Sequence, residues 1–233
     1  MLNNRLEIEI DLIIYVLGVV RMSSKKVFFR VLCGFFVIGL SSQSIAVDKG
    51  DWLVRFGGVS VNPNDSSGQV GNIGNSGVAV DDSQGLYINA TYMIRDNIGL
   101  ELLAATPLKH DISATGSIAA LGKIAETKQL PPTFSVQYHF APKKKFRPYV
   151  GGGINYTTFF SEKATGGTVT NISLDDSWGL AVQGGFDMDI SQNWFFNADL
   201  RYINIETTAT TNVGNVDVTI DPWVISLGVG TTF

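Results

Sequence analysis

Cysteine and histidine are scarce in this chain, and their scarcity excludes several kinds of site. Of 233 residues, one is Cys and two are His. The single thiol, Cys33, lies in an apolar stretch close behind Arg30, a poor context for a lipoprotein signal, so we interpret it as a packing residue. After residue 46 the chain has no cysteine, which excludes thiol chemistry, disulfides and a Cys-based zinc site there.

Long apolar runs are also absent beyond the N-terminal region. A membrane helix needs about 20 consecutive apolar residues. The two candidate segments, 12–20 and 27–40, are separated by the polar and basic residues 21–26. An anchor built from both segments is the alternative to a secretion signal, but each piece is too short to cross a membrane by itself.

The N-terminal region has the order of features that is typical of a signal peptide. Basic Lys25 and Lys26 precede the apolar run 27–40, and Ser44-Ile45-Ala46 places small residues at the −3 and −1 positions of a cleavage site. We therefore predict a signal region over 1–46, cleaved after Ala46, with translation starting at Met22. The mature domain is expected over 47–233.

The mature chain lacks an excess of positive charge. It has 12 Lys and Arg against 18 Asp and Glu, a net charge of −6. No basic patch of the kind that binds nucleic acid is visible, so a nucleic-acid partner is not expected.

What the mature chain has is alternation, seen most clearly in its last stretch, 223–233. Trp223, Ile225, Leu227 and Val229 fall on one parity, and small or polar residues fall on the other. Side chains alternate across a strand, so this is a strand with one oily face, about long enough to cross a bilayer at a tilt. Ending on Phe233, it resembles the last strand of bacterial outer-membrane barrels, which carries the signal for the barrel-assembly machinery. An edge strand of a soluble sandwich shows the same pattern.

The remaining chain favours the barrel. Seven more alternating segments are joined by connections that are alternately long and short, the pattern of a transmembrane barrel with both termini on the periplasmic side. The long connections are expected to be loops, and one of them, 107–131, is less polar than the others and is compatible with a short helix. The predicted fold is an all-β, eight-stranded antiparallel transmembrane β-barrel with strands at 51–61, 84–94, 98–106, 132–140, 147–158, 178–190, 194–208 and 223–233.

The charged residues decide between this barrel and a soluble lipocalin-like barrel, whose apolar residues would point inward. Seven of them lie on the parity opposite the oily one, which predicts a lumen charge network of Arg55, Glu101, Arg147, Asp187, Asp189, Asp199 and Arg201. The four tryptophans start strands on the oily parity. Trp52 and Trp194 are expected in a periplasmic aromatic girdle, and Trp178 and Trp223 in an outer one.

The stretch Phe146-Arg-Pro-Tyr-Val-Gly-Gly-Gly-Ile-Asn-Tyr-Thr-Thr-Phe-Phe160 closely resembles the OmpW family of outer-membrane proteins. The segments 107–112, 130–133 and 137–140 and the terminal Phe233 match as well. The resemblance covers essentially all of 47–233. It implies a narrow, rather hydrophobic lumen and uptake or efflux of small, often hydrophobic molecules. Some members of the family serve as receptors for phage or bacteriocins.

Three functions remain open at this point. The favoured one is a narrow channel for small hydrophobic molecules in the outer membrane, and the second is a structural or receptor barrel that works through its outer loops. A lipid-modifying enzyme is least favoured, because His110 and His139 are expected at opposite ends of the barrel. Lipid, lipopolysaccharide and a small hydrophobic ligand are the expected partners, with no cofactor and no metal. The candidate lining residues are Leu53, Tyr87, Leu103, Leu108, Ile118, Leu121, Leu130 and Phe195.

The small residues before the predicted cleavage site give a first test. The mature protein is expected to begin at Val47, because signal peptidase cuts after a small residue at −1. N-terminal sequencing of protein extracted from outer membranes checks this, and any residue before 40 retained on the protein contradicts it.

Overall fold

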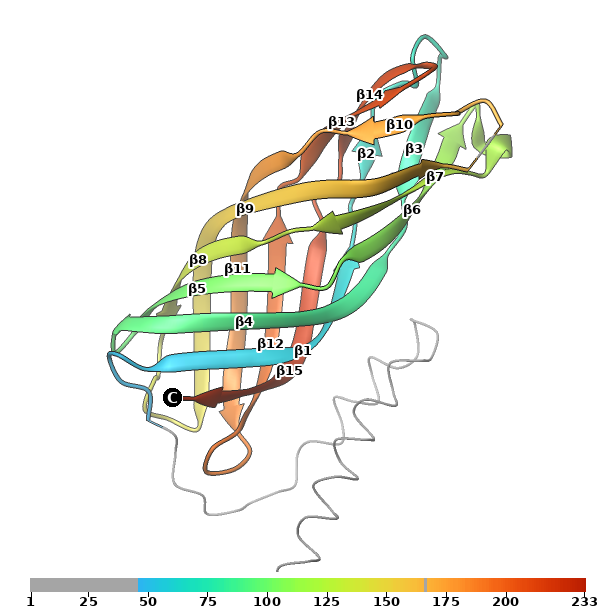
Figure 1. Ribbon diagram of the computed structural model, residues 1–233. Coiled ribbons are helices and arrows are strands. Elements are labelled where there is room, and N and C mark those ends of the chain that lie inside the picture. Colours follow the sequence, from blue (N-terminus) through green and yellow to red (C-terminus); the bar gives the residue numbers. More distant parts are fainter. Residues whose placement is uncertain (1–45, 166) are drawn as a thin grey trace, which may run out of the picture. The chain divides into compact units, whose positions relative to one another are not determined.

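Eight strands form a closed antiparallel barrel (Figure 1). The computed structural model describes residues 46–165 and 167–233, so the predicted signal region and Cys33 lie outside the described residues. The ring closes because β9 pairs with both β8 and β11, and β15 pairs with both β1 and β12. This confirms the predicted fold. The barrel strands are β1 (Trp52–Asn62), β4 (Ser83–Arg95), β5 (Ile98–Ala105), β8 (Thr133–His139), β9 (Phe146–Ala164), β11 (Ser177–Asp189), β12 (Phe195–Ile203) and β15 (Trp223–Thr232).

The four long connections extend the barrel beyond its membrane part. Two small sheets form there, one in the order β3-β6-β7-β9 and one in the order β10-β13-β14-β2. The elements added by these connections are β2 (Ser66–Ser67), β3 (Ser76–Val80), β6 (Leu108–Gly116), η2 (Ala119–Leu121), β7 (Lys123–Leu130), β10 (Ile172–Leu174), β13 (Glu206–Thr211) and β14 (Gly214–Thr219).

The expectation of irregular loops at these connections was wrong. The helix considered within 107–131 is a single 3₁₀ turn, and the strand expected over 194–208 ends at Ile203 and resumes at Glu206. The physical reason is that these segments carry their own weaker alternation. In β6, for example, Leu108, His110, Ile112 and Ala114 face inward while the alternate residues Lys109, Asp111 and Ser113 are more exposed. Pairing with distant strands then satisfies their backbone groups.

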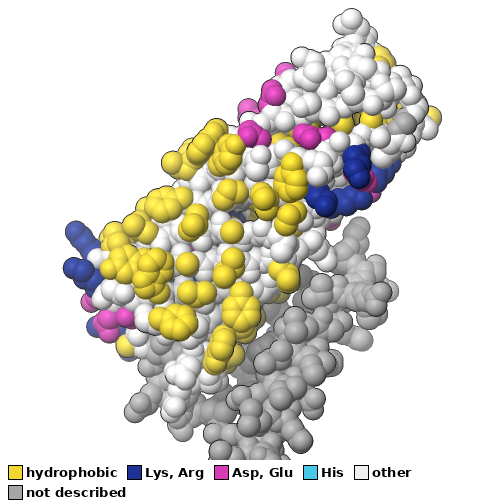
Figure 2. Space-filling model, in the orientation of Figure 1, with side chains coloured by type: hydrophobic (Ala, Val, Ile, Leu, Met, Phe, Trp, Pro, Cys, Tyr) yellow, Lys and Arg dark blue, Asp and Glu magenta, His cyan; other side chains and the backbone are white. Residues whose placement is uncertain are grey.

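The outside of the membrane part is apolar. Leu86, Leu180 and Val182 are among many large hydrophobic side chains that are more than half exposed, and Figure 2 shows hydrophobic side chains gathered in a broad band across the face of the barrel in view. Aromatic pairs flank the band: Trp52 lies 5.0 Å from Tyr92 between ring centroids, and Trp178 lies 4.7 Å from Tyr156. In the described ranges, no helix has the length and apolar character needed to cross a membrane. The exposed apolar band and buried charges are the arrangement of a barrel solvated by lipid.

The lipid-facing parity can be tested at Leu227, which is 42 % exposed near the middle of β15. Leu227→Arg is expected to lower the free energy of unfolding from the bilayer by about 2–4 kcal/mol, because a basic side chain at the bilayer midplane is poorly solvated. Leu121→Arg is the matched control, since Leu121 is exposed beyond the membrane part. The heat-shifted band of folded protein on a gel is the measurement. Equal folding yields of the two variants contradict the assigned parity.

Candidate functional site

A ring of hydrogen bonds, closed by one ion pair, crosses the lumen at mid-height. Its strongest link joins opposite sides of the barrel: Arg55 of β1 donates from Nε and Nη2 to the two carboxylate oxygens of Asp187 of β11, at 2.9 and 2.7 Å. Both side chains are fully buried. Such a two-pronged pair stabilises two buried charges that would each be costly alone.

From this pair the ring continues in both directions. Asn197 donates to Asp187 at 2.9 Å and to the Tyr149 hydroxyl at 3.1 Å, and Tyr149 donates to Asp199 at 3.0 Å. On the other side, Arg55 donates to Thr91 at 2.8 Å. Tyr87, a predicted lining residue, donates its hydroxyl to Asn197 from above at 3.2 Å. The ring therefore forms the lower boundary of the part of the lumen that lies on the outer side of Tyr87.

The second half of the ring is built around Glu101. Arg201 donates to Glu101 at 2.5 Å, Gln183 donates to the other carboxylate oxygen at 2.9 Å, and Gln137 donates to that same oxygen. Thr91 donates to Gln137 at 3.3 Å, and Arg201 lies 3.6 Å from Asp199, which completes the circle. Side chains from β1, β4, β5, β8, β9, β11 and β12 take part. Because every charged member is at most 6 % exposed, the ring fills the lumen at this level.

Below the ring, the periplasmic end of the lumen is closed by a small apolar cluster. Val47, Leu53, Met93 and Phe195 are completely buried together. Phe195 lies between two cations, with the guanidinium carbons of Arg55 and Arg147 at 5.7 and 5.2 Å from its ring centroid. Arg147 also pairs with Asp189 at 2.5 Å. The two predicted lining residues Leu53 and Phe195 thus lie beneath the charges.

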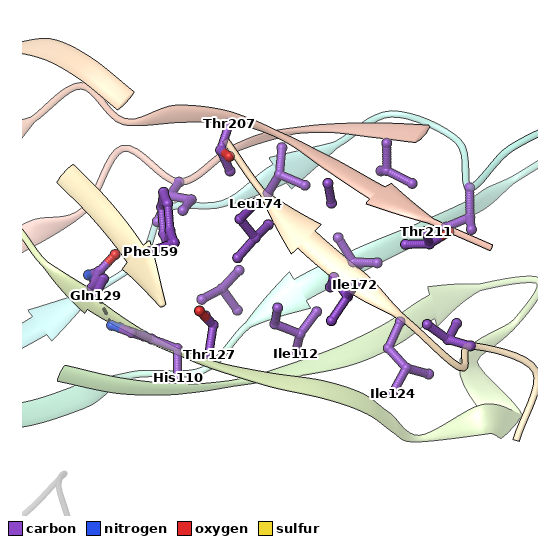
Figure 3. A pocket seen from close by; sticks show the side chains of 18 residues that line it. His110, Ile112, Ile124, Thr127, Gln129, Phe159, Ile172, Leu174, Thr207 and Thr211 are labelled. Atoms are coloured by element: carbon purple, nitrogen blue, oxygen red, sulfur yellow. Dashed lines mark hydrogen bonds between the residues drawn. The ribbon is translucent and has the colours of Figure 1, made fainter. Parts of the chain in front are cut away.

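Above the ring, the extended outer end encloses an apolar cavity of about 40 Å³ (Figure 3). Both small sheets contribute to its wall, with Ile112 and Ile124 on one side and Ile172 and Leu174 on the other. Thirteen of the 18 lining residues are apolar: Val70, Val78, Val80, Ile112, Ile124, Phe159, Val169, Ile172, Leu174, Ala209, Val216, Val218 and Ile220. Pockets that hold drug-sized ligands measure about 300–1,000 Å³, so the cavity in this structure is too small to hold such a ligand without widening.

One corner of the cavity is polar. His110 Nδ1 lies 2.7 Å from the Asp81 carbonyl oxygen, and His110 Nε2 lies 3.0 Å from Gln129 Nε2 (Figure 3). Burial lowers the pKa of His110, because the charged imidazolium would lose its hydration there. We assign the neutral tautomer, with Nδ1–H donating to Asp81 and Nε2 accepting from Gln129. The corner is therefore uncharged at neutral pH.

The predicted lining residues divide between three places. Tyr87, Leu103 and Leu108 belong to the buried apolar cluster that continues from the cavity down to the ring. Leu121 is 46 % exposed at the tip of the outer end, and Leu130 is half-buried. Ile118 packs against the cluster from outside, and none of these last three lines the cavity. The residues that do line it come from segments first treated as loops, where the alternation of Ile112, Ile124 and Leu174 with polar neighbours was the available signal.

The two histidines lie apart, as their strands require. His139 is buried near the periplasmic end, where Nε2 lies 3.1 Å from Gln137 Oε1, whereas His110 lines the outer cavity. Within the described ranges, no group of three or more His, Cys, Asp and Glu side chains is placed to hold a metal ion. Gly151 lies within β9 and leaves space for a neighbour, because a Cβ there would lie 2.8 Å from Gln183 Nε2.

Two seams separate the small sheets of the outer end. No backbone ladder joins the two sheets in the part of the chain that the structure describes. At the β2–β3 seam, the backbone N–H groups of Val70 and Val78 donate to Ser76 and Ser67 hydroxyls, both at 2.8 Å. At the β9–β10 seam, two longer bonds from backbone N–H groups reach carboxylates: Phe159 to Asp176 at 3.4 Å and Leu174 to Glu162 at 3.3 Å. These two backbone bonds are longer than those of the β2–β3 seam, and a short hydrogen bond from the Tyr156 hydroxyl to Asp176 also crosses the β9–β10 seam at its end nearest the membrane part.

The buried Arg55–Asp187 pair yields a quantitative prediction. Arg55→Met and Asp187→Leu are each expected to lower the free energy of unfolding by about 3–5 kcal/mol, since each strands one buried charge. The double variant is expected to lose less than the sum, because no unpaired charge remains. Urea unfolding from lipid vesicles, followed by tryptophan fluorescence, measures all three.

An exposed ion pair supplies the control. Lys123 and Asp111 lie 2.9 Å apart at the surface of the outer end, so Lys123→Gln and Asp111→Asn are expected to cost less than about 1 kcal/mol each. If Arg55→Met and Asp187→Leu also lower the free energy of unfolding by less than about 1 kcal/mol, the buried pair does not stabilise the barrel as described.

The comparisons with known proteins agree with this architecture. The OmpW family matches residues 48–233. Outer membrane protein W of Vibrio cholerae is 48 % identical over 88 % of this chain and 99 % of its own length. Outer membrane protein AlkL of Ectopseudomonas oleovorans is 28 % identical over 90 % of this chain and 97 % of its own length.

A solved structure supports the same conclusion. The crystal structure of outer membrane protein OprG from Pseudomonas aeruginosa superposes with a TM-score of 0.77 at 36 % identity, over 81 % of this chain and 98 % of that one. Extent, identity and closed barrel topology all point the same way, and this chain belongs to the OmpW family of outer-membrane proteins.

Proposed function

We propose that this barrel is a passage by which small apolar molecules leave the outside medium and reach the outer membrane. The observation that carries the proposal is the division of the lumen. An apolar cavity occupies the outer end, and a ring of buried charges lies beneath it, below the buried side chains of Tyr87, Leu103 and Leu108. An apolar molecule is stabilised in the cavity by leaving water. The charged groups of the ring offer an apolar molecule no comparable stabilisation.

The ring opposes further movement down the lumen. An apolar molecule there would have to break hydrogen bonds between buried charged groups such as Arg55 and Asp187, and stranding one partner of such a pair costs about 3–5 kcal/mol. Ions and water meet the same filled cross-section. We therefore infer that this barrel does not act as a general aqueous porin, consistent with the small interior of an eight-stranded barrel.

The β9–β10 seam supplies a sideways exit. Phe159 and Leu174 line the cavity and also carry the two long hydrogen bonds of the seam. The pairing of β9 with β11 begins just below, at Thr157 and Ser177, beside the outer aromatic pair of Tyr156 and Trp178. A molecule passing through the seam would emerge where the bilayer begins. The cavity of about 40 Å³ must widen first, and we infer that it does so by breaking the two long backbone bonds of this seam while the Tyr156–Asp176 hydrogen bond holds its lower end.

Neither histidine has a catalytic role in this proposal. Both ring nitrogens of His110 are engaged in hydrogen bonds that fix its position, and its neutral form suits a polar contact within an apolar site. The alternative of a receptor or purely structural barrel predicts no dependence of solute uptake on the cavity wall.

The proposal is tested by placing charge inside the cavity. A variant with Ile112→Asp and Leu174→Asp is expected to lower uptake of a fluorescent apolar probe to the level of cells without the protein, because two carboxylates make the cavity polar. The control carries Ser113→Asp and Ser173→Asp on the outward parity of the same strands. It has the same added charge and is expected to retain uptake.

Folding is checked in parallel by the heat-shifted gel band, so that loss of the barrel is distinguished from loss of passage. Uptake by the cavity variant equal to that of the unsubstituted protein contradicts the proposal. If the unsubstituted protein also fails to exceed cells without it, the receptor or structural role is the one supported.

A further inference from the structure

The outer end of the barrel carries its positive charge on one face only. The segments beyond the membrane part, 62–82, 106–132, 158–176 and 204–222, contain 11 acidic residues and four basic ones. The four are Lys109, Lys123, Lys128 and Lys163. Although they come from two different connections, all four lie in the β6–β7–β9 sheet, and none lies in the other small sheet.

These lysines, which we call the basic face, point away from the cavity. On β6 and β7 they alternate with the inward residues His110, Ile124 and Gln129. Figure 2 shows basic side chains gathered just beyond the apolar band, over the region of β6 and β7. The basic face is therefore separate from the cavity and from the proposed passage.

The ion pairs within the basic face neutralise only part of its positive charge. Glu126 lies 2.8 Å from Lys109, and Asp111 lies 2.9 Å from Lys123. Hydrogen bonds from Lys109 and then Lys123 lower the pKa of Glu126, so it stays ionised. Two carboxylates thus stand against four ammonium groups. Within the described ranges, neither Lys128 nor Lys163 has a carboxylate oxygen within 4.0 Å.

The local geometry concentrates this charge. Lys109 and Lys128 are directly paired neighbours on β6 and β7, an arrangement in which like charges repel. A register shift between Glu126 and Lys128 meets Ser161 on β9, whose φ is 56°. Beside this irregularity lies a surface hollow of about 90 Å³ lined by Lys109, Glu126, Thr127, Lys128, Ser161 and Lys163. A bound anion would relieve the repulsion and fill the hollow.

The height of the basic face identifies the anion. Lys128 pairs with Phe160, which is four residues beyond Tyr156 of the outer aromatic pair. Four residues span about 13 Å along a strand, or about 10 Å along the membrane normal at a tilt of about 40°. Lysine side chains reach back toward the membrane from that height. The head groups at that depth of the outer leaflet belong to lipopolysaccharide, whose lipid A carries phosphates above its acyl chains.

We propose that the basic face is a binding site for the phosphate groups of lipid A, with Lys128 and Lys163 as its principal ligands and Lys109 beside them. The acidic remainder of the outer end repels the same phosphates. One molecule of lipopolysaccharide is therefore held preferentially against the β6–β7–β9 face, and this sets which side of the barrel is in close lipid contact.

The test uses folded full-length protein in detergent micelles and two fluorescent probes, lipid A with both phosphates and lipid A with both removed. The unsubstituted protein is expected to bind the phosphorylated probe more tightly. Lys128→Gln with Lys163→Gln is expected to weaken that binding about tenfold, since two charge-assisted contacts are lost. Lys128→Arg with Lys163→Arg is expected to keep it.

The matched control removes the same charge at the other end of the barrel, with Lys144→Gln and Lys145→Gln in the turn between β8 and β9, and is expected to bind as the unsubstituted protein does. Equal binding of the two probes, or equal loss in the control, overturns the proposal. Competition by millimolar inorganic phosphate that abolishes binding overturns the lipid as the source of the anion. The heat-shifted band confirms that each variant is folded.

Discussion

Closure of the backbone ladder is the constraint on which the rest of this structure depends. In hydrocarbon no water satisfies a free N–H or C=O group, so a sheet that crosses a membrane must have no edge. The pairing of β9 with β11 and of β15 with β1 meets this requirement. A closed ring of eight strands leaves an interior only wide enough for side chains. Every charged residue that faces inward must then find its partner inside a narrow, water-poor space.

The ring of buried hydrogen bonds follows from that confinement. Arg55 and Arg201 each face carboxylates across the lumen, and neutral groups such as Asn197 and Gln137 connect the two halves. This network stabilises the buried charges, although Arg201 Nε and Nη1 have no hydrogen-bond partner among the described residues, and it also obstructs the lumen at mid-height. The same interaction that makes the polar interior tolerable thus separates the outer cavity from the periplasmic end. The lumen is thereby divided into an outer apolar compartment and a separate periplasmic part.

The outer end does not need a continuous backbone ladder, because water is available there. Backbone groups at the two seams are satisfied by side chains such as Ser76 and Asp176 in place of a continuous ladder. When such hydrogen bonds break in the outer end, water can replace them. In the membrane part no water is available to do so. Charge is also distributed freely over this surface. The gathering of all four lysines of the outer end on one sheet, amid an excess of carboxylates, gives the outer end one basic side.

The sequence by itself determined the barrel, because period-two alternation and the placement of charge are local properties of each strand. The parity of Arg55 and Asp187 and the exposure of Trp178 could be read from neighbouring residues. The chain beyond the membrane was misjudged, since β6, β7 and β13 alternate weakly and are strands only through pairing with distant segments. For the same reason, the lining of the cavity and the meeting of Lys128 with Lys163 were decided only by the tertiary structure. Contacts between residues far apart in sequence depend on register, and no local pattern in these segments specifies register.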